Sequence, residues 1–108
     1  MANEFANAQK VGVTTVQTVY TAAAGKTCIM LELDIANTTS AVVEASVQIF
    51  DTSATTSAYI VKNAPVPAGG SLMVIAGQKI VLEPTDIVKV TATGAVDVVA
   101  AILEDVNP

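Results

Sequence analysis

The chain contains no histidine, no arginine and no tryptophan, and it has a single cysteine among its 108 residues. Without histidine, the common pairs of nucleophile and general base cannot be built. One cysteine excludes a disulfide within the chain, and Cys28 lies in an apolar run, which is typical of a buried thiol. We therefore expect no enzyme and no cofactor, and we assign no catalytic, metal-binding or cofactor-binding residue.

Charged residues are scarce, at 14%, and the net charge is −5, from ten acidic residues and five lysines. The lysines are scattered singly, whereas a protein that binds nucleic acid needs a positive face that displaces counterions from phosphates. We therefore expect no direct contact with nucleic acid. A charge-poor, apolar composition is typical of a subunit covered by its neighbours. The alternative is a compact monomer with a surface of threonine and serine.

Long apolar runs are also missing. Residues 1–10 lack the basic start and apolar centre of a signal peptide. No stretch reaches the roughly 18 apolar residues that a membrane helix needs. We expect the protein to be made in the cytosol, to stay soluble at least until it assembles, and to have no membrane contact.

Valine, threonine, isoleucine and alanine dominate instead, in short runs separated by turn residues. About eight such runs, at close spacing and without a helical period, predict a sandwich or a small barrel. In residues 27–36 the alternation predicts one face towards the core (Ile29, Leu31, Leu33, Ile35) and one towards solvent (Met30, Glu32, Asp34). The run from Val43 to Ile49 follows a short polar turn, so we expect these two strands to pair as a hairpin.

These features predict an all-β protein with one antiparallel β-sandwich, of jelly-roll or immunoglobulin-like topology, over residues 11–108. Residues 1–10 are small and polar apart from Phe5, and we expect them to form a flexible, extended N-terminal arm. The prolines and glycines of residues 64–70 place that segment at an edge or between sheets. Residues 83–86 (EPTD) fit a type I turn, with proline at its second position.

The last strand, residues 97–103, is apolar on both faces, although a sheet with one wet face should alternate. Either the strand is central and covered on both sides within one molecule, or its second face packs on another subunit. We favour the second reading, because a chain this short has little material for a third layer. The candidate subunit interface is then Val99, Ala101 and Leu103, together with Phe5 of the arm.

The second half of the chain carries a recognisable order of turns and strands. Three segments show it: Tyr59–Leu72 (YIVKNAPVPAGGSL), Gly77–Val90 (GQKIVLEPTDIVKV) and Asp97–Glu104 (DVVAAILE). In this order the chain resembles small virion proteins of tailed bacteriophages. Residues 20–27 and 35–38 match the first half of the same scheme, so the resemblance covers nearly all of the chain after residue 10.

The resemblance implies a β-sandwich structural component of a phage virion. Proteins of this kind are cement or decoration subunits on the capsid, which typically work as trimers, or accessory subunits of the neck or tail. The implied partners are further copies of the same chain, as a homotrimer or another homo-oligomer, and the major capsid protein or neck and tail proteins. A receptor-binding or glycan-binding module is the other reading, because Phe50, on a polar strand face, and Tyr59 would offer rings for stacking.

Overall fold

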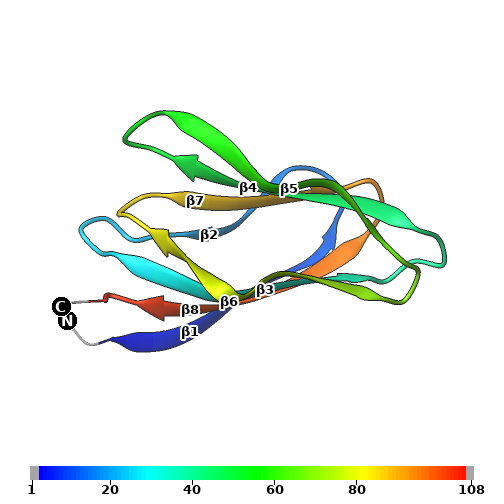
Figure 1. The fold of residues 1–108 in the computed structure, drawn as a ribbon, viewed down its shortest axis with the longest axis horizontal. Helices are drawn as coiled ribbons and strands as arrows, with labels where there is room; N and C mark the ends of the chain where they lie inside the picture. Colours follow the sequence, from blue (N-terminus) through cyan, green and yellow to red (C-terminus); the bar gives the residue numbers. More distant parts are fainter. Residues whose placement is uncertain (1–2, 107–108) are drawn as a thin grey trace.

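The computed structural model describes residues 3–106, which form eight strands arranged in two facing antiparallel sheets (Figure 1). None of these residues belongs to a helix that could cross a membrane. The strands are β1 (Glu4–Val13), β2 (Gln17–Thr21), β3 (Cys28–Asn37), β4 (Val43–Asp51), β5 (Thr56–Val66), β6 (Ser71–Leu82), β7 (Ile87–Ala92) and β8 (Val96–Glu104).

The order of the strands is that of a jelly roll. One sheet, the β8 sheet, has the order β1-β8-β3-β6, and the other, the β7 sheet, has the order β2-β7-β4-β5. Every connection crosses from one sheet to the other except the β4–β5 hairpin, which gives the two interlocked Greek keys of this architecture. The expected antiparallel β-sandwich is confirmed, and of the two topologies considered the structure has the jelly roll.

Small aliphatic side chains fill the space between the sheets. The largest completely buried ones are Met30, Leu33, Ile35, Ile75, Leu82 and Ile102, surrounded by valines. Cys28 is 1% exposed and lies among them as a free thiol, as expected. A core without large rings depends on close interdigitation of branched side chains, which suits two twisted sheets packed about 10 Å apart.

The connection between β3 and β4 differs from the sequence expectation. The two strands do not form a hairpin, because β3 pairs with β6 and β8 while β4 pairs with β5 and β7. Asn37 directs the chain across the edge of the sandwich. Its side-chain amide donates to the carbonyls of Ala41 and Val66, and its oxygen accepts from Thr39, so this buried side chain is fully used. A short polar linker thus makes a crossover rather than a hairpin turn.

The expected arm over residues 1–10 is a second difference. Glu4–Lys10 form the first part of β1 and pair with β8 from Glu104 back to Val98. Residues 1–2 lie outside the described part of the chain. The small, polar composition was misleading because β1 is an edge strand: Ala8 packs on the core, while its neighbours face solvent.

Two local features were also missed in the sequence. Thr85 has a φ of 70°, and the backbone N–H of Asp86 donates to the Glu83 carbonyl at 3.0 Å. A positive φ at the third position is the mark of a type II turn, so the expected type I turn is wrong. In β3, the pairing with both neighbours shifts between Met30 and Glu32, which places a β-bulge at Leu31. Met30 therefore turns inward and is fully buried, contrary to the strict alternation.

Candidate subunit interface

Among residues 3–106, no third layer covers the outer face of the β8 sheet. In an antiparallel sheet, directly opposite residues point to the same face, so the register shows which side chains meet. One row crosses all four strands and consists entirely of apolar residues, namely Phe5, Leu103, Ile29 and Val81, in the order β1, β8, β3, β6. We call these four residues the apolar row. Phe5 is 80% exposed and Val81 is 62% exposed.

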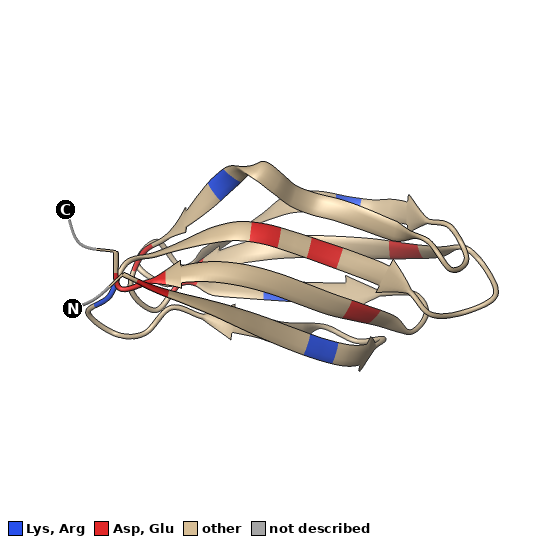
Figure 2. Ribbon diagram, turned by 90° about the horizontal axis from the view of Figure 1, so that it is seen from below, with Lys and Arg blue, Asp and Glu red and all other residues tan. Residues whose placement is uncertain are grey.

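Two further rows lie beside the apolar row. The middle row contains Asn7, Ala101, Glu32 and Ala76, and the next contains Gln9, Val99, Asp34 and Met73. Met73 and Val99 are 67% and 47% exposed. The acidic positions of this face lie along the central strands, and Figure 2 shows how few charged positions the sheet carries. The face is therefore apolar along the apolar row and on the β6 edge, polar at Asn7 and Gln9 on the β1 edge, and acidic at Glu32 and Asp34 on β3.

The four residues expected at a subunit interface share this face. Phe5 stands directly opposite Leu103, and Ala101 and Val99 follow on the same side of β8. β8 is a central strand, as expected if both of its apolar faces were covered within one molecule. Its outer side is nevertheless partly open, because Val99 is 47% exposed. Whether another subunit covers it remains a proposal. An open apolar face of this kind is a common mark of an interaction site.

Three residues of the same face were not identified from the sequence. Ile29 was expected to face the core, and Val81 and Met73 lie in apolar runs of β6 whose direction the sequence does not indicate. The outward direction of these side chains can be recognised only from the pairing of β6 with β3, which places Val81 opposite Ile29 and Met73 opposite Asp34. The pairing of strands distant in sequence was therefore the missing information.

The acidic part of the face has unusual electrostatics. One carboxylate oxygen of Asp34, Oδ1, is buried and has no hydrogen-bond partner within residues 3–106. Burial, and then the neighbouring Glu32 carboxyl, raise the pKa of Asp34 to about 6. Across the sheet Asp34 faces only Val99 on β8 and Met73 on β6, so neither neighbour supplies a compensating positive charge.

This raised pKa predicts an inverted pH dependence of stability. Between pH 4 and 6 the folded chain holds a proton on Asp34 that the unfolded chain releases, so the free energy of unfolding rises as the pH falls through this window. The destabilisation is fully present above pH 6. We expect Asp34→Asn to raise the melting temperature at pH 7 and to flatten the profile between pH 7 and 4, whereas Glu44→Gln, at an exposed position on β4, leaves the profile unchanged. A variant profile as steep as that of the wild type would refute this assignment.

The outer face of the β7 sheet carries the two rings considered for glycan binding. Phe50 is half-buried and Tyr59 is 50% exposed. The ammonium groups of Lys89 and Lys62 lie 5.1 Å from the ring centres of Phe50 and Tyr59, respectively. Each ring is thus engaged in a cation–π contact within the chain. No pocket opens on or between residues 3–106.

Comparison with known proteins does not assign this chain to a family. Neither a family model nor a curated protein matches the sequence. A solved structure, titled "Structure of infectious bursal disease virus Gt strain", aligns with 97% of this chain and 35% of that chain, with 10% identity and a TM-score of 0.37. The present chain thus spans about a third of the length of that viral chain. At this level the likeness carries no argument about function.

Proposed function

We propose that this chain is a non-enzymatic structural subunit of a phage virion, and specifically a cement or decoration protein that stabilises the capsid shell. The observation that carries the proposal is the apolar row, which crosses the whole outer face of the β8 sheet and ends in the exposed side chains of Phe5 and Val81. The resemblance of the sequence to small virion proteins of tailed phages supports the same role. Viral capsid domains are among the common uses of the jelly roll.

The mechanism is binding free energy. Apolar area removed from water contributes about 25 cal/mol per Å², from which the costs of ordering and association are subtracted. A stable interface typically buries about 800 Å² on each partner. The apolar row, with Val99 and Met73 beside it, would form the centre of such an interface, in contact with further copies of this chain or with the major capsid protein. Repeating the contact over many copies would strengthen a shell against internal pressure.

The test has two parts. The mass of the purified protein in solution, measured by light scattering after gel filtration, is expected to be that of a homo-oligomer, with a trimer as the first candidate. Purified particles are expected to contain the protein at a stoichiometry comparable to that of the shell subunits, and particle imaging should place it on the capsid. A monomer at all concentrations that is absent from purified particles would refute the proposal.

An accessory role at the neck or tail is the alternative within the same class. It requires the same open face and differs only in the position on the particle. Imaging separates the two, because a neck or tail protein would be found at low copy number at one vertex and not over the shell.

A receptor-binding or glycan-binding module is the alternative from a different class, since lectin domains also use the jelly roll. The half-exposed ring of Tyr59 is the observation that favours it. Its matched test is the pair Phe50→Ala and Tyr59→Ala, measured for binding to host cells and to a glycan array. Wild-type binding that both substitutions abolish would support this module, and binding that neither changes would reject it.

A further inference from the structure

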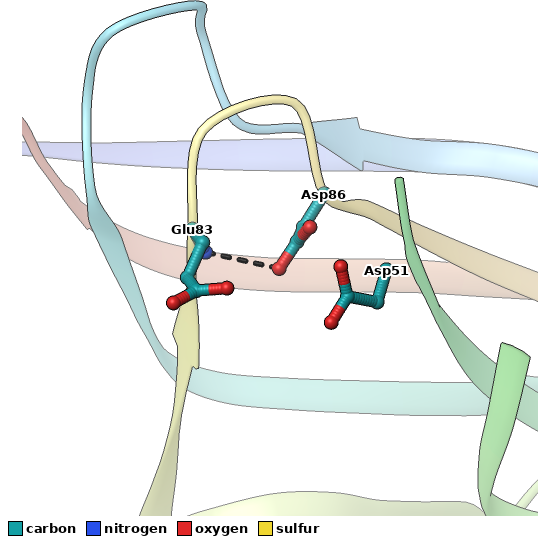
Figure 3. A group of neighbouring side chains, drawn as sticks. All are labelled: Asp51, Glu83 and Asp86. Atoms are coloured by element: carbon teal, nitrogen blue, oxygen red, sulfur yellow. Dashed lines mark hydrogen bonds between the residues drawn. The ribbon is translucent and has the colours of Figure 1, made fainter. Parts of the chain in front are cut away.

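Three carboxylates meet at one end of the sandwich, the same end that carries the apolar row, since Glu83 is two residues beyond Val81. Asp51 is the last residue of β4, Glu83 follows β6 and Asp86 precedes β7, so both sheets contribute. One ligand oxygen from each residue lies within 4.8 Å of those of the other two. Figure 3 shows the three carboxyl groups side by side, with that of Asp86 between the other two.

The turn between β6 and β7 holds Asp86 in a fixed position. Its Oδ2 accepts the backbone N–H of Glu83 at 3.0 Å, and its own backbone carbonyl accepts the N–H of Ala22 at 2.9 Å. Asp86 is only 5% exposed. Its second carboxylate oxygen, Oδ1, is buried and has no hydrogen-bond partner among the described residues. A buried, unpartnered carboxylate oxygen is costly, so it indicates a ligand that the protein atoms do not provide.

The carboxylate of Asp51 is also held in place by hydrogen bonds. Its Oδ1 accepts from the hydroxyl and the N–H of Ser53 and from the N–H of Ala54. The Ser53 hydroxyl and then the Ala54 N–H lower the pKa of Asp51, so this carboxyl is ionised at neutral pH. The bonds to Oδ1 orient the group and leave Oδ2 for another contact.

The cluster brings three acidic groups together without a positive partner. No ion pair joins any of the three to a lysine among residues 3–106. Like charges at this separation oppose one another, and the opposition is stronger where one group is withdrawn from water. A bound cation would satisfy the unpartnered oxygen of Asp86 and remove the repulsion together.

We infer that Asp51, Glu83 and Asp86 form a binding site for a divalent cation of the calcium type. Ca²⁺ takes six to eight oxygen ligands at about 2.4 Å, so two ligand oxygens on one ion lie at most about 4.8 Å apart, and the cluster fits within that span. Carboxylate oxygens supply three positions, and water would complete the shell on the open side. The ion would join the end of β4 to the turn that leads from β6 into β7, and so connect the two sheets.

Thermal unfolding of the full chain in EDTA and in CaCl₂ tests the site. We expect Ca²⁺ to raise the melting temperature of the wild type by about 10 °C when its free concentration is about 100 times the Kd. Asp51→Asn and Glu83→Gln, which retain size and hydrogen-bond acceptors, are expected to lose this shift. Glu44→Gln, which removes a carboxylate from an exposed position on β4, should keep it. MgCl₂ should give a smaller shift, because Mg²⁺ demands a tighter octahedral shell.

A second readout separates loss of binding from loss of folding. In EDTA Glu83→Gln is expected to melt at or above the wild-type temperature, because it removes one of three repelling charges. Asp51→Asn also weakens the hydrogen bonds from Ser53 and Ala54, so it serves as a binding variant only. Calorimetric titration with CaCl₂ should show one site per chain in the wild type and none in the variants. The inference is overturned if Ca²⁺ leaves the wild type unchanged, or if the variants respond as the wild type does. Neither result would test the apolar row, so the cation site is tested independently of the proposed virion role.

Discussion

Val81→Asp is expected to convert the proposed homo-oligomer into monomers. Val81 ends the apolar row on the edge strand β6 and is 62% exposed in the isolated chain, so its side chain matters little for the fold of one subunit. In an interface over the β8 sheet, the new carboxylate would be buried among Ile29 and the side chains of a neighbour. Burial of an unpaired charge should weaken association by at least about 100-fold, measured by light scattering over a dilution series.

The chain offers a closely matched control for this substitution. Val42 lies in the β3–β4 connection and is 64% exposed, so Val42→Asp adds the same charge at the same exposure away from the face. We expect Val42→Asp to leave the mass in solution unchanged and Phe5→Asp, at the other end of the apolar row, to behave like Val81→Asp. If the control dissociates the oligomer as well, added charge rather than the outer face is responsible, and the interface is misplaced.

Met30→Ala is expected to lower the free energy of unfolding by about 2–5 kcal/mol, because it removes a fully buried side chain and leaves a cavity between the sheets. The same change at Met73, which is 67% exposed on the outer face, should cost less than about 0.5 kcal/mol when both changes are made in the monomeric Val81→Asp background, where no subunit covers Met73. The pair compares one residue type at two positions, so differences in intrinsic propensity cancel. Urea unfolding followed by circular dichroism gives both values.

The outcome of this comparison decides the register of β3. Strict alternation from Ile29 would place Met30 in solvent, and Met30→Ala would then be nearly neutral. The bulge at Leu31 places it in the core. Equal stability of the two methionine variants would therefore show that the bulge is not present in the folded protein.

The residues of β8 show what pattern alone can predict. Alternation places Val98, Ala100 and Ile102 on the side opposite to Val99, Ala101 and Leu103, and all three are buried between the sheets. The segment over residues 64–70 was placed at an edge or between sheets because its prolines lack a donor, and Pro65 indeed lies on the edge strand β5, just before the chain crosses to β6. Such inferences succeed because they depend on local geometry: the direction of successive side chains, and the missing N–H of proline.

The acidic cluster shows what local pattern leaves out. Asp86 lies in the turn that the sequence predicts over residues 83–86, and Asp51 lies more than 30 residues earlier in the chain. The jelly roll places β4 next to β7 and leads β6 into β7 across the end of the sandwich, and this brings the two carboxylates together with Glu83. No spacing in the sequence predicts this cluster of carboxylates, because its members are brought together by strand pairing and not by a common loop.

The sequence by itself determined the class of this protein: side chains that alternate with a period of two, few rings, few charges and frequent turn residues allow little other than a β-sandwich. The tertiary structure decided which strands are neighbours, and with that the jelly-roll order, the incorporation of residues 4–10 into β1, the inward turn of Met30 and the apolar row. The physical reason is that alternation fixes only the two faces of each strand. The choice of partner depends on how all eight strands bury their apolar faces at once, and no single segment contains that information.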